Sequence, residues 1–119
     1  MTQVNIKRVY DPAEDSDGYR VLVDKLWPRG VKKEELHYNL WAKDIAPSTQ
    51  LREWFHDNRE ANWSEFREKY MAELENSTPM LDFINDIRHR HTVTLLYASR
   101  DREKNHAQIL KDYISGHLK

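Results

Sequence analysis

The chain has 119 residues, a net charge of −1 and no cysteine, and 39% of its residues are hydrophobic against 33% charged. This length supports a single domain, spanning residues 1–119, with its own core. The absence of cysteine excludes disulfides, thiolate nucleophiles and sulfur-ligated zinc. The balanced charge gives no general indication of nucleic-acid or membrane binding.

The N-terminal half predicts two strands. In residues 4–10 hydrophobic and polar side chains alternate, which predicts a half-buried or edge strand, and the turn-rich residues 11–18 predict a loop. Residues 19–26 contain three consecutive apolar residues, typical of a strand covered on both faces. Residues 31–39 favour one helical turn, and residues 38–45 a short strand or an irregular segment.

The middle of the chain predicts three helices. Ser48 can cap a helix in which Leu51, Trp54 and Phe55 repeat at helical spacing. Asn62, followed three residues later by Glu65, resembles a capping box and predicts the start of a second helix. In a third helix, Thr78 serves as the cap and Pro79 as the first helical residue.

The C-terminal part returns to a strand and ends in a helix. Residues 92–98, "TVTLLYA", are β-branched and apolar, and an amphipathic helix follows the polar loop 99–105. Together the elements predict a small, single-domain, layered α/β fold with a short, mainly parallel or mixed sheet flanked by helices. The order of the strands is not predicted.

Chemistry concentrates where the two most hydrophobic strands end. If strands 20–26 and 93–98 are parallel neighbours, the segments "DKLWPRG" and "SRDREKNHA" emerge together at the carboxyl edge, where open α/β sheets bind ligands. These segments supply the polar and aromatic residues Asp24, Trp27, Arg29, Ser99, Arg100, Asp101, Asn105 and His106.

Each candidate in the first segment has a functional and a structural interpretation. Asp24 fits a general base or a metal ligand, or equally a loop cap paired with Arg29. Trp27 can stack on a flat ligand, although a hydrophobic plug is the more common role of such a residue. Arg29 can clamp a phosphate or carboxylate, or serve in a structural ion pair.

The second segment and the region around Ser48 leave similar alternatives. Near a helix N-terminus the His106 ring stays neutral and can accept a proton, although surface histidines are more common. Asp101 is expected to cap the last helix rather than to act in catalysis. Ser48 is expected to be a cap and not a nucleophile, since no base and no G-x-S-x-G turn accompany it.

Several long motifs carry a family resemblance. The stretches "RVYD", "GYRVLVDKLWPRG", "LWAKDIAPS", "LREWF", "EFREKYMAEL" and "TLLYASRDREKNHAQIL" occur in this order and resemble the DUF488 family, in its short YeaO-like branch. The resemblance implies a compact bacterial α/β domain and does not supply a reaction. The polar residues at matching positions are Arg20, Asp24, Arg29, Asp44, Ser48, Arg52, Asp101, Asn105 and His106.

Three hypotheses follow, and the first is favoured. In the first, the protein binds a small anionic molecule at the carboxyl edge of the sheet, with or without transforming it, and Asp24 and His106 are the catalytic pair. The expected ligand-binding residues are Arg20, Trp27, Arg29, Asp44, Ser48, Arg52, Asp101 and Asn105; no metal ligand, cofactor or oligomeric state is assigned. The second hypothesis is a nucleic-acid- or protein-binding regulatory module without chemistry.

The third hypothesis is structural. In it, Asp24, Arg29, Asp44 and Arg52 form a buried ion network that holds "WPRG" in place. The N-terminal segment "MTQVNIKRVY" lacks the apolar core of a signal peptide, and no segment approaches the roughly 20 apolar residues of a membrane span. We therefore expect a cytoplasmic protein with no membrane partner.

Overall fold

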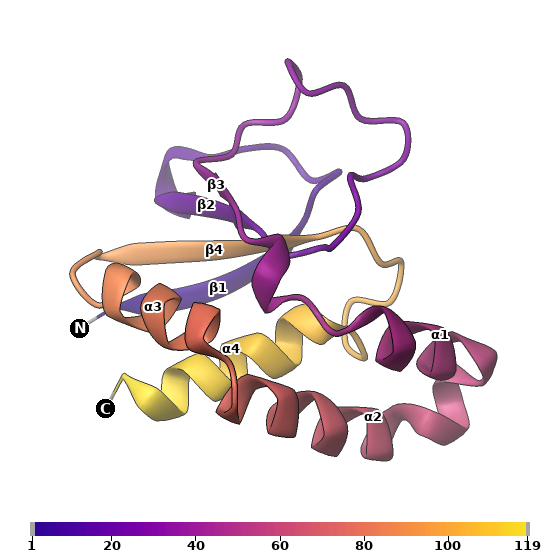
Figure 1. The fold of residues 1–119 in the computed structure, drawn as a ribbon. Coiled ribbons are helices and arrows are strands. Elements are labelled where there is room, and N and C mark those ends of the chain that lie inside the picture. The colour runs from indigo at the N-terminus through magenta and orange to yellow at the C-terminus, as the bar shows by residue number, and fades with distance from the viewer. Residues whose placement is uncertain (1, 119) are drawn as a thin grey trace.

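A four-stranded sheet lies at the centre of the computed structural model, which describes residues 2–118 (Figure 1). The strand order is β1-β4-β2-β3, and every pairing is parallel, which confirms the α/β class. The elements in chain order are β1 (Gln3–Arg8), η1 (Asp15–Asp17), β2 (Tyr19–Leu22), β3 (Leu40–Trp41), η2 (Lys43–Ile45), α1 (Thr49–Asp57), α2 (Arg59–Glu75), α3 (Thr78–Ile87), β4 (Thr92–Tyr97) and α4 (His106–His117).

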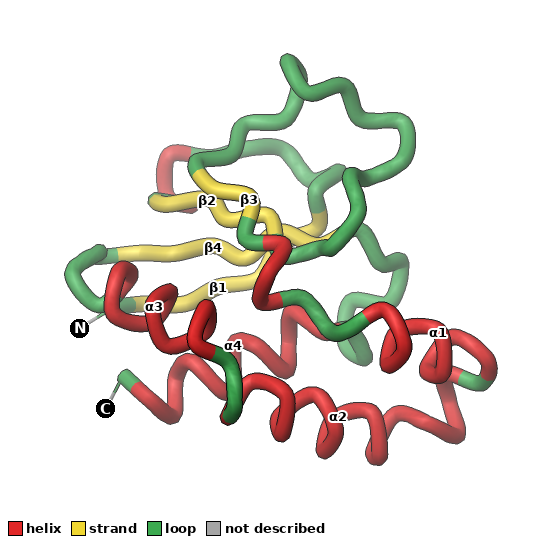
Figure 2. The backbone as a smooth tube through the Cα atoms, in the orientation of Figure 1, coloured by secondary structure: helices red, strands yellow, loops and turns green. Residues whose placement is uncertain are grey.

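The two faces of the sheet are covered differently. The four α-helices lie on one side, where they form the larger core with Val21 and Leu95 (Figures 1 and 2). The other side is covered by the loop between β2 and β3, which packs Trp27 and Leu36 against Leu22. Helices therefore flank only one face, and an irregular segment replaces them on the other.

Several predicted boundaries are wrong by a few residues. The strand expected over 19–26 ends at Leu22, because the chain turns away where Asp24 bonds to the end of β4. The second helix starts at Arg59 rather than near Asn62, since Asn58 already caps it through the Ala61 N–H at 3.2 Å. Residues 31–39 contain the single turn that was predicted, in which Leu36 N donates to Lys32 O at 3.3 Å.

Two helix caps also differ from the prediction. Ser77, one residue before Thr78, caps α3 by accepting a hydrogen bond from Met80 N at 3.1 Å. Asn105, and not Asp101, caps α4 by accepting from Gln108 N at 2.9 Å. Asp101 instead begins a separate turn before α4, in which its Oδ1 accepts hydrogen bonds from the backbone N–H groups of Glu103 and Lys104. Ser48 caps α1 as expected.

A network of charges joins β1 to β2 beside η1. The Lys7 ammonium bonds to Glu14 at 2.8 Å and to Asp17 at 2.9 Å. Arg20, which is 6% exposed, donates to the other Asp17 oxygen. Burial raises the pKa of Asp17, but hydrogen bonds from Lys7, the Glu14 N–H and Arg20 outweigh it, so the pKa lies below its ordinary value of 3.8. Asp17 therefore stays ionised against two cations.

Among residues 2–118, no helix combines the length and the apolar character that crossing a membrane requires.

The charge network yields a test of stability. Asp17→Asn leaves the buried Arg20 without its anion, so we expect urea unfolding at pH 7 to show a loss of about 3 kcal/mol. The matched control is Asp15→Asn, in the same turn but exposed, which should change stability by less than about 0.5 kcal/mol.

The contribution of Asp17 also has a defined pH dependence. Because its folded pKa is lowered, the stabilisation is complete above the unfolded pKa of about 3.9 and is lost as the pH falls through the folded pKa. The difference between wild type and Asp17→Asn should therefore shrink in acid. A difference that is constant down to pH 2 would contradict this account.

Candidate functional site

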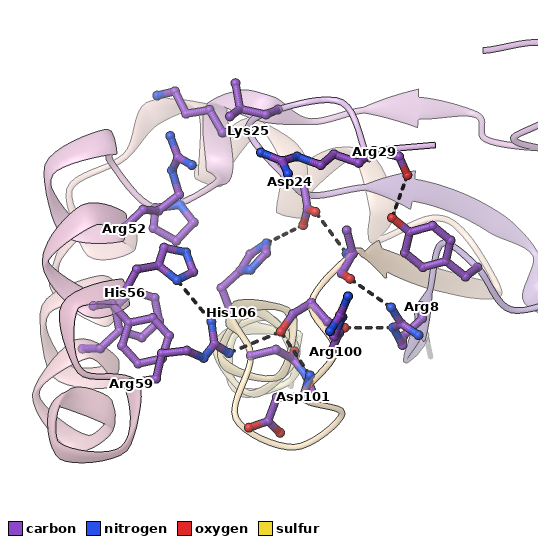
Figure 3. Close-up of a pocket in the computed structure, with 18 residues that line it drawn as sticks. Arg8, Asp24, Lys25, Arg29, Arg52, His56, Arg59, Arg100, Asp101 and His106 are labelled. Carbon is purple, nitrogen blue, oxygen red and sulfur yellow. Dashed lines mark hydrogen bonds and ion pairs between the residues drawn. The ribbon is translucent and has the colours of Figure 1, made fainter. Parts of the chain in front are cut away.

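A pocket of about 790 Å³ opens at the carboxyl edge of the sheet, where the ends of β1, β2 and β4 meet α1, α2 and the start of α4 (Figure 3). Its size is within the range of small-molecule sites. Five arginines line it, and we call it the arginine pocket: Arg8, Arg29, Arg52, Arg59 and Arg100. Lys25, His56, His106, Asp24 and Asp101 also line the pocket.

Asp24 and His106 lie together at its centre. One Asp24 oxygen, Oδ2, accepts a hydrogen bond from Ala98 N at 3.0 Å, and the other, Oδ1, lies 3.1 Å from His106 Nε2. His106 Nε2 is also 3.0 Å from the carbonyl oxygen of Val23. A nitrogen that faces two acceptor oxygens carries a hydrogen, so Nε2 is a donor here and is not the proton-accepting atom of the ring.

Backbone carbonyl groups hold two of the arginines. Arg8 donates from Nε to Ser99 O at 2.9 Å and from one terminal nitrogen to Ala98 O at 3.2 Å. Arg59, the first residue of α2, approaches the same loop from the other side, donating to Ser99 Oγ at 3.3 Å and Lys104 O at 3.2 Å. These contacts orient both guanidinium groups without neutralising them, because a carbonyl is a dipole and not an anion.

The loop "WPRG" contributes Arg29 to the pocket, while Trp27 points elsewhere. The carbonyl oxygen of Arg29 accepts a hydrogen bond from the Tyr10 hydroxyl at 2.9 Å, which ties the loop to the end of β1. Trp27 donates to Val31 O at 2.6 Å and packs edge-on against Tyr38 and Trp41, outside the residues that line the pocket. The indole therefore anchors the loop on the sheet.

The structure brings together six of the ten predicted site residues. Asp24, Arg29, Arg52, Asp101, Asn105 and His106 line the arginine pocket. The other four, Arg20, Trp27, Asp44 and Ser48, do not. Ser48, at the start of α1, donates a hydrogen bond to Glu73 of α2. Asp44 is exposed in η2.

The hypothesis of an ion network among Asp24, Arg29, Asp44 and Arg52 is not supported by the contacts. Within residues 2–118, no ion pair joins any two of them; the partner of Asp24 is His106. The Nε atom of Arg52 is buried and has no hydrogen-bond partner in the described chain.

Sequence reasoning missed several pocket residues. Arg59 and His56 lie at the junction of α1 and α2, which the prediction placed four residues too late. Asn58, a good N-cap directly before Arg59, was the signal that could have placed the junction correctly. Arg8 was not among the predicted site residues, because its position at the end of β1 becomes informative only once β1 pairs with β4.

The carboxylate positions are poor for metal binding. In the described part of the chain, no group of three or more His, Cys, Asp or Glu side chains is arranged to hold a metal ion. Asp101 is occupied by the N–H groups of Lys104 and Glu103, which lower its pKa. The pocket therefore contains more guanidinium groups than carboxylates, and they surround the Asp24–His106 pair.

Comparison with known proteins finds a family and several relatives. A family model described as "Inactive DUF488-N3 subclade" matches residues 3–119. The uncharacterized protein YeaO of Escherichia coli K12 is 47% identical over 111 residues, covering 93% of this chain and 96% of YeaO. The uncharacterized protein Rv3073c of Mycobacterium tuberculosis H37Rv is 37% identical over 115 residues, covering 97% and 96%. No solved structure gives a significant match.

The position of Ser48 yields a test that separates capping from ligand binding. Its hydroxyl accepts from Leu51 N and donates to Glu73 at 2.6 Å, so Ser48→Ala should cost about 1–2 kcal/mol in urea unfolding. Ser64→Ala, at an exposed position within α2, is the matched control and should not destabilise the protein. Weaker anion binding by Ser48→Ala at unchanged stability would refute the capping role.

Proposed function

Because the chain belongs to the inactive DUF488-N3 subclade, we propose that it binds a small anionic molecule in the arginine pocket without transforming it. The description of the subclade supports a role in binding over one in catalysis. The ligand class is a phosphate-bearing or carboxylate-bearing molecule, recognised by guanidinium donors. The alternative, a nucleic-acid-binding module, remains as an outcome of the test.

The observation that carries this proposal is the distribution of unpaired arginines. Of the ten arginines, Arg20, Arg67, Arg90 and Arg102 each have a carboxylate within 4.0 Å. Among residues 2–118, the arginines without such a partner are Arg8, Arg29, Arg52, Arg59, Arg88 and Arg100, and all but Arg88 line the pocket. Lys25 adds a sixth pocket cation without a carboxylate partner in the described chain.

Such an arrangement is costly without an anion. Like charges repel across the pocket, and two aspartates do not balance five guanidinium groups and one ammonium group. Arg8 and Arg59 are already oriented by backbone carbonyls, so less side-chain freedom remains to be lost on binding. A ligand with several anionic oxygens would supply the missing counter-charge.

The central Asp24–His106 pair is better suited to holding the site than to chemistry. Asp24 fixes the start of its loop to the end of β4 through Oδ2, and Nε2 of His106 donates to the carbonyl oxygen of Val23. Oδ1 of Asp24 forms no hydrogen bond within residues 2–118, but it is buried beside the His106 ring, so its lone pairs are not presented to a ligand. We assign both as positioning residues, in place of the catalytic roles that the sequence suggested.

The apolar part of the lining limits the ligand further. The side chains of Phe55, Phe66, Leu26 and Pro47 share the pocket with the cations. A bare inorganic anion would leave this surface uncovered. We therefore expect the physiological ligand to join its anionic group to an organic body of moderate size.

Arg29 offers a direct test, because its exposed side chain forms no hydrogen bond or ion pair with the rest of residues 2–118. Calorimetric titration with inorganic pyrophosphate at low salt should show binding by the wild type. Arg29→Ala should weaken this binding about tenfold, the value of one charge-assisted hydrogen bond. Its melting temperature should not change.

The matched control is Arg88→Ala, which removes an arginine outside the pocket that, like Arg29, has no carboxylate partner among residues 2–118. This variant should bind pyrophosphate as the wild type does. Equal weakening by both variants would indicate nonspecific charge attraction, and absence of binding by the wild type would refute the proposal. Tighter binding of single-stranded oligonucleotides than of pyrophosphate, lost in Arg29→Ala, would favour the nucleic-acid alternative.

A further inference from the structure

We propose that His56 is a ligand-contacting residue of the arginine pocket and that anion binding is coupled to the uptake of a proton by its imidazole ring. The inference rests on the proposed function and adds a specific residue and a pH dependence to it. His56 lies on α1 at the rim of the pocket, where its ring is exposed to an incoming ligand (Figure 3).

The first argument is the contact between His56 and Arg59. Nδ1 of His56 lies 3.4 Å from a terminal nitrogen of Arg59, and α1 places Arg52 one turn before His56 on the same face. A guanidinium group can only donate, so Nδ1 accepts and the ring is neutral with its hydrogen on Nε2. Protonation at Nδ1 would set two cations against each other at this distance.

The second argument is the charge of the surrounding elements. Partial desolvation lowers the pKa of His56, and the charges of Arg59, Arg52 and His106 lower it further. The acids in the pocket are engaged elsewhere, Asp24 with His106 and Asp101 with backbone N–H groups. The charged or titratable groups that share the pocket with His56 come from α1, α2, α4, β1 and the loops after β1, β2 and β4: Arg52, Arg59, His106, Arg8, Tyr10, Asp24, Lys25, Arg29, Arg100 and Asp101.

An anion reverses this balance. A negative ligand among the arginines neutralises the positive potential that disfavours the His56 imidazolium. The ligand also accepts hydrogen bonds from the nitrogens of the protonated ring. The pKa of His56 therefore rises on binding, and protons are taken up at any pH between the free and bound values. Affinity increases as the pH falls, by up to about tenfold per pH unit, the limit for one linked proton.

The test uses sulfate, which remains a dianion across the relevant pH range, so that any proton taken up enters the protein. Calorimetric titrations in two buffers of different ionisation enthalpy give the number of protons bound per sulfate. We expect net uptake by the wild type near neutral pH, and its loss in His56→Gln. His89→Gln, at an exposed histidine just before β4 on the opposite edge of the sheet, should retain it.

Direct titration of the His56 ring by NMR, with and without sulfate, provides a second measurement that needs no variant. We expect the pKa of His56 to rise when sulfate is present. Sulfate binding without proton uptake, or uptake that persists in His56→Gln, would overturn this inference and leave the proposed function standing. Absence of sulfate binding at every pH would overturn this inference, and absence of pyrophosphate binding as well would refute the proposed function.

Discussion

The bonds of Asp24 hold the functional edge of this protein together. Its carboxylate joins Ala98 at the end of β4 to His106 at the start of α4, and its carbonyl oxygen accepts a hydrogen bond from Trp41 at 2.7 Å. One residue thus connects the ends of three adjacent strands and a helix. The arginine pocket keeps its shape because these ends cannot separate without leaving polar groups unpaired.

Much of this arrangement could be predicted from the sequence. Consecutive apolar residues identified β2 and β4 as buried strands, and parallel neighbours must bring their carboxyl ends to one edge. Hence the expectation that Asp24 faces the loop after β4 agrees with its bond to Ala98. Arg8 and Arg59 could not be placed in this way, because their positions depend on the pairing of β1 with β4 and on the turn between α1 and α2.

Trp27 shows where local reasoning fails. A tryptophan beside Asp24 and Arg29 resembles part of a binding site, but three residues of loop are enough to turn a side chain to the other face of a sheet. The aromatic ring packs edge-on against Trp41 and Tyr38 and belongs to the smaller core on the other face of the sheet. The polar residues after β2 therefore identified the carboxyl edge as the binding region. Packing in the smaller core determined that Trp27 lies on the face opposite the helices.

The uneven covering of the sheet has a consequence for how the molecule fluctuates. The loop between β2 and β3 buries few side chains compared with the helical layer, so its local opening requires less free energy than global unfolding. This loop also carries Lys25 and Arg29. We therefore expect local opening of this loop to widen the pocket while the helical core, with Arg52 and Arg59, remains folded. Ligand exchange would then not require unfolding of the whole domain.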